Sequence, residues 1–156
     1  MSSSAERRRY KRPQSVLVLV YTAAGEVLLL RRVHPRDFWQ SVTGSLGWGE
    51  SRQRAARREL FEETGLRAGR ALQDWRCGVR FPIVAPWRAR YAPGTRYNRE
   101  YWFALRLRRR AKIRLNPREH GEYRWLRRPQ ALRLASSWSN RRAIRLLGRR
   151  LLARPR

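Results

Sequence analysis

The feature that most constrains this chain is a concentration of carboxylates on one predicted helix. Of only 11 acidic residues, four fall within positions 50–63: Glu50, Glu59, Glu62 and Glu63. Residues 51–64 are good helix formers without glycine or proline, and Gly65 suits the position that ends a helix. On that helix three of the acids lie at i, i+3 and i+4, so they share one face.

Like charges at these spacings repel each other and weaken a helix. A divalent cation is the simplest compensation, because Mg²⁺ and Mn²⁺ prefer hard oxygen ligands and accept waters or phosphates as further ligands. The alternative is a solvated face neutralised by arginine, since Arg58 can pair with Glu62 at i+4. The residues around the helix favour the metal site.

The helix belongs to a longer pattern of fixed spacing. Gly44 is followed by five residues and Glu50, then by seven residues and the run Arg58-Glu59-Leu60-Phe61-Glu62-Glu63-Thr64-Gly65-Leu66. The pattern matches, position for position, the 23-residue box of the Nudix hydrolases, and the chain is identified as a member of that family. The resemblance implies an α/β fold, an α/β/α sandwich with a mixed β-sheet and a catalytic loop-helix-loop at residues 44–66.

The same resemblance implies a role for each residue of the box. The metal ligands would be Glu59, Glu62 and Glu63, and the residues that brace loop and helix would be Glu50 and Arg58. The chemistry would be hydrolysis of a diphosphate linkage, in which metal ions neutralise phosphate oxygens and lower the pKa of a water. A carboxylate must accept the proton of that water. The box could supply this base, or another loop could: Asp37, Asp74, Glu100, Glu119 or Glu122.

Outside the box, several stretches resemble the bacterial dihydroneopterin triphosphate pyrophosphatases of folate synthesis. They are residues 10–13, 37–45, 90–94, 119–126 and 137–141, and the likeness covers most of residues 10–147. It implies that Glu119 is a further metal ligand. It also implies a set of substrate contacts: Lys11, Arg31, Thr43, Phe81, Pro82, Ile83, Val84 and Ser137.

Each of these substrate contacts has a plainer interpretation. Lys11 and Arg31 can hold a triphosphate by charge-assisted hydrogen bonds, but most arginines are solvated and Arg32 fits as well by spacing. Phe81, like the tryptophans, can stack on a pterin or pack in the core. Ser137 can contact substrate or cap the C-terminal helix.

Hydrophobic patterning predicts alternating strands and helices, hence a mixed sheet covered by helices. The predicted strands are 15–21, 27–32, 71–81, 99–107 and 123–126, and a second helix is predicted at 139–153. The first two strands form a hairpin. Glycine-rich residues 33–49 and proline-rich residues 82–98 are predicted as loops. We expect a flexible Ser/Arg-rich tail at 1–9 and one domain at 10–156.

Composition leaves the partner open. The formal net charge is +27, and only two of the 38 basic residues, Lys11 and Lys112, are lysines. So strong a basic balance raises the possibility of nucleic-acid binding, but the arginines are spread along the whole chain, which favours codon bias and a small polyanionic substrate. With one cysteine and two histidines, the sequence contains no cluster of these residues at the spacing of a zinc site. No apolar run approaches the length of a membrane helix.

The sequence therefore predicts a cytoplasmic, Mg²⁺-dependent enzyme, with Mn²⁺ possible, that converts dihydroneopterin triphosphate to dihydroneopterin monophosphate and pyrophosphate. A nucleoside triphosphate pyrophosphohydrolase is one alternative. The other is an RNA-binding protein or RNA 5′-end pyrophosphohydrolase that uses the basic surface, whose affinity would fall steeply with salt. The sequence sets no oligomeric state.

Overall fold

A computed structural model describes residues 3–153, in which the strands form one seven-stranded mixed sheet. The strands are β1 (Gln14–Thr22), β2 (Glu26–Arg32), β3 (Trp39–Gln40), β4 (Val42–Ser45), β5 (Gln73–Pro82), β6 (Tyr97–Leu107) and β7 (His120–Arg127). The helices are α1 (Ser4–Arg7), α2 (Arg52–Thr64), α3 (Arg128–Leu134) and α4 (Trp138–Leu152), with 3₁₀ turns at Gly69–Ala71 and Trp87–Arg90.

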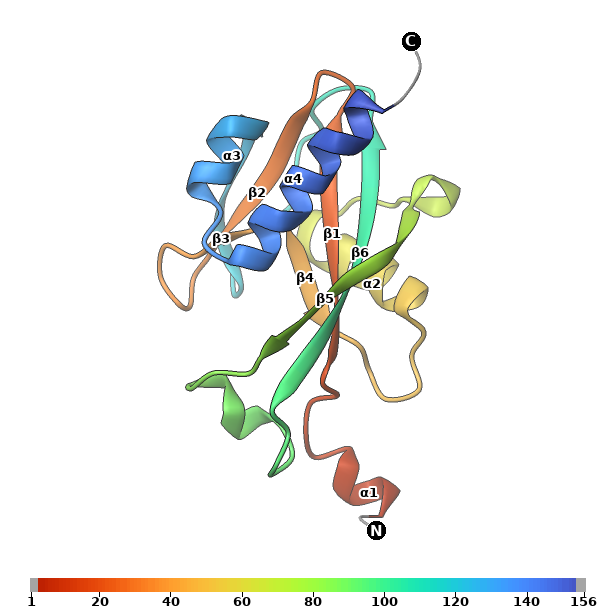
Figure 1. The fold of residues 1–156 in the computed structure, drawn as a ribbon, viewed down its shortest axis with the longest axis vertical. Helices are drawn as coiled ribbons and strands as arrows, with labels where there is room; N and C mark the ends of the chain where they lie inside the picture. Colours follow the sequence, from red (N-terminus) through yellow and green to blue (C-terminus); the bar gives the residue numbers. More distant parts are fainter. Residues whose placement is uncertain (1–2, 154–156) are drawn as a thin grey trace.

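The sheet order is β3-β2-β1-β6-β5, with β4 also paired to β1 and β7 to β2. The β1–β6 pair is parallel and the other pairs are antiparallel. Figure 1 shows α4 crossing in front of β1 and α2 lying behind the sheet. Helices on both faces of a mixed sheet confirm the predicted α/β class.

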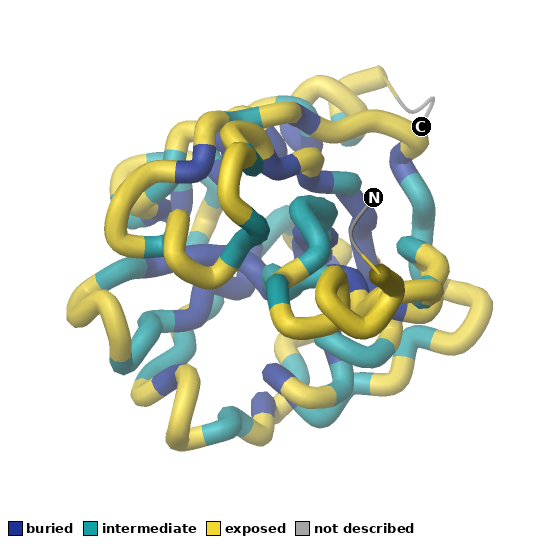
Figure 2. The backbone as a smooth tube through the Cα atoms, turned by 90° about the horizontal axis from the view of Figure 1, so that it is seen from below, coloured by how far each residue is buried: buried dark blue, intermediate teal, exposed yellow. Residues whose placement is uncertain are grey.

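The central strand β1 serves two cores because its side chains alternate between the faces of the sheet. Leu17, Leu19 and Tyr21 pack under α3 and α4, whereas Val16, Val18 and Val20 pack under α2. A strand that is buried on both faces has a continuous apolar sequence, as β1 has over residues 16–21. Seen from below, buried segments lie in the interior of the molecule, and the loops nearest the viewer are mostly exposed (Figure 2).

Most predicted elements are present, with ends shifted by a few residues. The β1–β2 hairpin pairs Tyr21 with Val27. Helix α2 begins after Ser51, whose side chain accepts a hydrogen bond from the Arg54 amide, and ends at Gly65 with φ 76°. The final helix begins at Trp138 because Ser137 caps it.

The prediction of a plain loop over residues 33–49 is wrong. This stretch contains β3 and β4, and β4 pairs with β1 from Ser15↔Ser45 to Val18↔Val42. Glycine and polar residues hid these short strands, whose hydrogen bonds come from a distant partner. Helix α3, which starts next to Pro129, was missed as well. Within the expected tail, residues 1–2 lie outside the described part and α1 is an exposed single turn.

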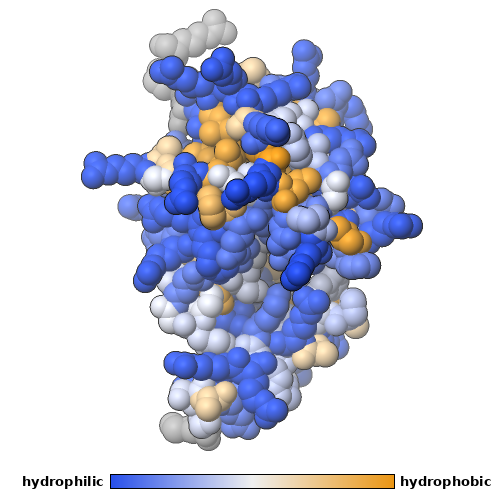
Figure 3. Space-filling model, turned by 180° about the vertical axis from the view of Figure 1, so that it is seen from behind, coloured by the Kyte–Doolittle hydropathy of each residue, from blue (hydrophilic) through white to orange (hydrophobic). Residues whose placement is uncertain are grey.

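The surplus of arginine lies mainly on the surface. The face seen from behind, on the α2 side, is hydrophilic apart from an apolar area in its upper part (Figure 3). Cys77 is exposed and unpaired. Among the described residues, no helix has the length and apolarity that crossing a membrane requires.

Asn140, in the first turn of α4, fixes this helix to the sheet. Its Oδ1 accepts a hydrogen bond from the Ser41 amide at 2.6 Å, and its Nδ2 donates to the Ser41 hydroxyl at 2.9 Å. Both residues are buried, so neither group can turn to water instead.

We expect Asn140→Ala to lower the free energy of unfolding by about 1–3 kcal/mol, because it leaves the Ser41 amide buried without an acceptor. Urea denaturation measures this change. Arg145→Ala, on the exposed side of the same helix, is the control and should stay within about 0.5 kcal/mol of the parent. Equal stability of both variants would contradict the anchoring role.

Candidate active site

Arg58 organises the start of the site. Its guanidinium makes two hydrogen bonds of 2.8 Å with the Glu50 carboxylate and one of 3.1 Å with the Ser45 carbonyl oxygen. It also contacts Glu59 at 2.8 Å and Glu62 at 3.2 Å. These hydrogen bonds lower the pKa of Glu50 to about 2. The predicted bracing pair therefore lies where loop, helix and β4 meet.

The loop 46–50 is held by two residues that sequence reasoning did not assign to the site. Arg12 donates from Nη1 to the carbonyl oxygens of Gly47 at 3.1 Å and Glu50 at 2.9 Å. Trp48 donates from its indole nitrogen to the Tyr10 carbonyl at 2.9 Å. The N-terminal segment thus fixes the loop from outside, which only a three-dimensional structure reveals.

Gly44 is required by the close approach of Glu59. The Glu59 carboxylate lies directly over the Cα of Gly44, in the space that a Cβ atom would need. The Glu59 side chain is only 12% exposed. Helix and strand can bring this carboxylate against the sheet only if position 44 has no side chain.

The two most buried carboxylates of α2 resist ionisation. Burial raises the pKa of Glu59 to about 7, although Arg58 acts in the opposite direction. Burial also raises the pKa of Glu63 well above its usual range, and the charges of Glu59 and Glu119 add to this effect. The Thr43 amide donates to Glu63 at 3.3 Å. Oxygen ligands crowded in this way fit a hard divalent cation.

Glu119 joins this cluster from a distant loop. Val33, directly after β2, donates its amide to the Glu119 carbonyl at 2.8 Å, and the amides of Glu119 and His120 both donate to the Asn116 carbonyl. One potential ligand atom from each of Glu63, Glu119 and His120 lies within 4.8 Å of the others. Of the five acids considered as a base outside the box, Glu119 is the one placed here.

His120 was not predicted as a site residue. It is buried, and its Nδ1 has no hydrogen-bond partner among the described residues. Burial, with the charge of Arg32, lowers its pKa to about 4, so the imidazole is neutral and can act as a ligand or acceptor. Its position directly after Glu119 was the only signal available in the sequence.

The other acids considered as a base lie elsewhere. Asp74 pairs with Arg52 at 2.9 Å, and Glu122 pairs with Arg31 and Arg124. Asp37 also lies near Arg31, and Glu100 is buried in β6. Within the box, Glu62 is exposed and contacts Arg58.

Two cationic groups, Lys11 and Arg32, interact with the charges of the carboxylates, and Arg90 lies beside both of these cations. The Lys11 amide donates to the Arg90 carbonyl at 2.8 Å. Burial and then the charges of Arg90 and Arg32 lower the pKa of Lys11, while Glu59 and Glu119 raise it. Burial lowers the pKa of Arg32 as well, against the charges of Glu63 and Glu119. Negative and positive groups therefore converge at one place.

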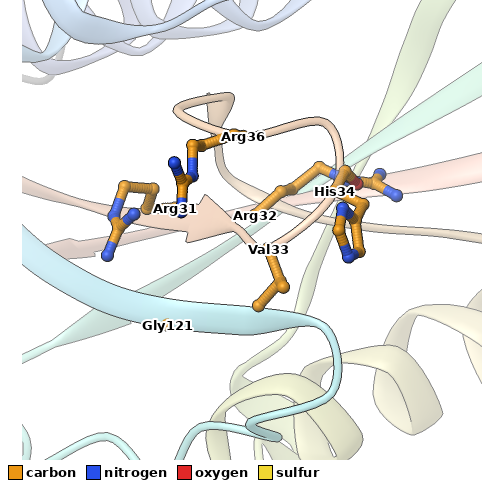
Figure 4. Close-up of a pocket in the computed structure, with 6 residues that line it drawn as sticks. All are labelled: Arg31, Arg32, Val33, His34, Arg36 and Gly121. Carbon is orange, nitrogen blue, oxygen red and sulfur yellow. The ribbon is translucent and has the colours of Figure 1, made fainter.

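Arg31 points away from this cluster. It contacts Glu122 at 3.1 Å and Asp37 at 3.6 Å. Figure 4 shows Arg31 and Arg32 extending in opposite directions from β2, as neighbours on a strand do. Between them and β7 lies a hollow of about 340 Å³, lined by Arg31, Arg32, Val33, His34, Arg36 and Gly121.

The remaining predicted contacts lie around the sheet face that α4 partly covers. Thr43 pairs with Leu17 of that core, and Phe81 packs against the same core. Ile83 is buried, while Pro82 and Val84 are exposed. Ser137 caps α4, and its Oγ lies 3.4 Å from Ser139 Oγ. Both Trp39 and Trp102 are buried in this core.

The chain is similar to proteins of a known family. The NUDIX domain family matches residues 11–147. The chain is 45% identical over 139 residues to dihydroneopterin triphosphate diphosphatase of Escherichia coli, covering 86% of this chain and 91% of that protein. The Haemophilus influenzae protein of the same name is 36% identical, with 88% of each chain covered.

A solved structure of a protein named for the same activity is similar to this chain in fold. The E. coli dihydroneopterin triphosphate pyrophosphohydrolase superposes with a TM-score of 0.81 at 44% identity, covering 88% of this chain and 95% of that one. This confirms the predicted Nudix-type fold.

We expect the apparent affinity for Mn²⁺ to rise from pH 6 to pH 8. A carboxylate must lose its proton before it can bind a metal, and the pKa of Glu59 is about 7. Below pH 7 the proton competes, and each lost unit of pH should cost up to about tenfold in affinity for one coupled proton. Titration of free Mn²⁺ by electron paramagnetic resonance measures this affinity.

The variant Glu63→Gln should weaken Mn²⁺ binding by at least about tenfold, the loss of one charged ligand. Glu26→Gln is the matched control, because Glu26 contacts Arg110 away from the cluster. Affinity that does not change with pH, or with Glu63→Gln, would argue against a metal site here.

Proposed function

Because this chain belongs to the NUDIX family, we propose that it is a pyrophosphohydrolase that converts dihydroneopterin triphosphate to dihydroneopterin monophosphate and pyrophosphate. The observation that carries the proposal is the meeting of the α2 carboxylates and Glu119 with the cations Lys11 and Arg32, next to which Arg90 lies. The substrate is inferred from the two bacterial relatives that bear the name of this activity.

The residues that would hold Mg²⁺, or Mn²⁺, are Glu59, Glu63 and Glu119, with Glu62 at the margin of the cluster. The raised pKa values of Glu59 and Glu63, and the short distance between the ligand atoms of Glu63 and Glu119, support this role. When bound, the metal neutralises phosphate oxygens and lowers the pKa of a water. His120 supplies a neutral, buried imidazole beside Glu63 and Glu119.

The reaction needs a base and charge neutralisation. The water oxygen forms a bond to a phosphorus of the anhydride between the first and second phosphates, and the anhydride P–O bond breaks. The water's proton passes to a carboxylate of the cluster, and pyrophosphate leaves. Lys11, Arg32 and Arg90 hold the phosphate oxygens by charge-assisted hydrogen bonds and oppose their repulsion of the incoming oxygen.

The proposed setting is the cytoplasm. The single cysteine, Cys77, is unpaired, which fits a reducing compartment. The proposed partner is a small triphosphate substrate, and a nucleic acid is the less favoured alternative that the basic surface keeps open.

The test of the substrate is pyrophosphate release with Mg²⁺ from dihydroneopterin triphosphate, from ordinary and oxidised nucleoside triphosphates, and from 5′-triphosphorylated RNA. We expect kcat/KM for the pterin to exceed the others by about a hundredfold, or about 3 kcal/mol in transition-state stabilisation. Glu59→Gln serves as the inactive control. A preference for RNA or for a nucleotide would refute the pterin assignment and retain the hydrolase.

A second test separates two adjacent arginines of β2. The resemblance suggested Arg31 as a substrate contact, whereas Arg32 borders the carboxylates. We expect Arg32→Ala to lower kcat/KM for the pterin triphosphate by about 10- to 100-fold, the loss of a charged hydrogen bond. Arg31→Ala should change it less than about threefold, because Arg31 contacts Glu122 and Asp37. The reverse order would place the phosphates next to Arg31.

A further inference from the structure

One buried acid stands apart from both the carboxylate cluster and the arginines. Seven of the 11 acids have an arginine nitrogen within 4.0 Å: Glu26, Asp37, Glu50, Glu59, Glu62, Asp74 and Glu122. Glu63 and Glu119 lie in the cluster, and Glu6 is exposed. Glu100 is 5% exposed and has no such partner within residues 3–153. In a chain with net charge +27, this isolation needs an explanation.

The partners of Glu100 are neutral. Its Oε1 accepts a hydrogen bond from the Trp102 indole nitrogen at 3.0 Å. Burial raises the pKa of Glu100 to about 7, although hydrogen bonds from Trp102 and Ser139 act in the opposite direction. A carboxylate has about four sites for donors, so two neutral donors leave it with unused capacity.

Asn98 provides a second unsatisfied acceptor on the same strand. Its Nδ2 donates to the Ser15 hydroxyl at 2.8 Å, while its buried Oδ1 has no partner among the described residues. Asn98, Glu100 and Trp102 alternate along β6 and so share the α4 side of the sheet, where Trp102 packs. This place therefore has an excess of acceptors, which a ligand with N–H donors would satisfy.

The position also suits a substrate whose phosphates lie at the carboxylate cluster. Across the sheet, Ser15 pairs with Glu100 on one side and with Ser45 on the other. Ser45 belongs to β4, whose Thr43 amide donates to Glu63. Phe81 pairs with Asn98, and Ser139 lies beside Ser137. Figure 1 shows the N-terminal end of α4 stopping above this lower part of β5 and β6.

We propose that Glu100 and Asn98 bind the edge of the substrate's heterocycle that carries an amine beside a ring N–H. A pterin presents such a pair of adjacent donors, and two carboxylate oxygens can accept them side by side. The inference rests on the proposed function and assigns its substrate preference to two residues outside the Nudix box. Glu100 here is a specificity residue, and the proton of the attacking water goes elsewhere.

The alternative is that Glu100 only ties β6 to the start of α4 through Ser139. A purely structural role would affect every substrate alike, so the test compares triphosphates that differ in this edge. Dihydroneopterin triphosphate and GTP carry both donors, ITP lacks the amine, and ATP lacks the ring N–H.

The experiment measures kcat/KM of Glu100→Gln on these four triphosphates. We expect about a 10- to 100-fold loss for dihydroneopterin triphosphate and GTP, because the amide NH₂ of glutamine faces the substrate's own donors. The value for ATP should change less than about threefold, and the loss for ITP, which keeps the ring N–H, should be smaller than the loss for GTP. Glu26→Gln is the matched control, because Glu26 contacts Arg110; this variant should leave kcat/KM unchanged for all four triphosphates. Equal losses on all four substrates, or no loss on the pterin, would overturn the proposal.

Two further measurements keep this test independent of the proposed function. Calorimetric binding of dihydroneopterin triphosphate without added metal should weaken at least about tenfold in Glu100→Gln whether or not hydrolysis occurs. If the parent hydrolyses GTP in preference to the pterin and Glu100→Gln lowers kcat/KM for GTP while leaving ATP unchanged, the substrate assignment fails while the role of Glu100 stands. Should Glu100→Gln not fold, Asn98→Ala must show the same selective loss, and a uniform one would refute the proposal.

Discussion

The ion pair between Arg58 and Glu50 is the interaction on which the rest of the site depends. One guanidinium contacts the loop through Glu50, the sheet through the Ser45 carbonyl and the helix through Glu59. Arg58 is therefore the point at which three separate chain segments acquire fixed positions. Its positive charge also offsets the mutual repulsion of the carboxylates on α2. Arg58 contacts Glu59 and Glu62, whereas Glu63 forms no ion pair with an arginine within the described residues.

Much of this arrangement could be predicted because its determinants are local. The spacing of Glu59, Glu62 and Glu63 on a helix, the cap at Ser51 and the stop at Gly65 follow from the backbone geometry of consecutive residues. Glu119 came from resemblance alone, because no local rule relates a loop residue to a helix so far away in the sequence. Strand β4 escaped prediction since its hydrogen bonds come from β1 and its own residues form no apolar alternation.

The choice between Arg31 and Arg32 shows where sequence reasoning reached its limit. Both are arginines at the end of one strand, and they differ only in the face of the sheet to which each side chain points. A shift of the strand by one residue would exchange these two faces. The pairing of β2 with β7 contains an irregularity between these two residues. His120 and Arg12 were missed for a related reason, since their relation to the site exists only across strands and loops.

The N-terminal segment of residues 10–14 lies between the two loops that flank the site. The Tyr10 carbonyl accepts from Trp48, the Lys11 amide donates to Arg90, and the Arg12 side chain contacts Glu50. The Gln14 carbonyl then accepts from Leu46. A purification tag or fusion partner attached close to this segment would therefore disturb the loop that holds Glu50, so a recombinant form needs its spacer well ahead of Tyr10.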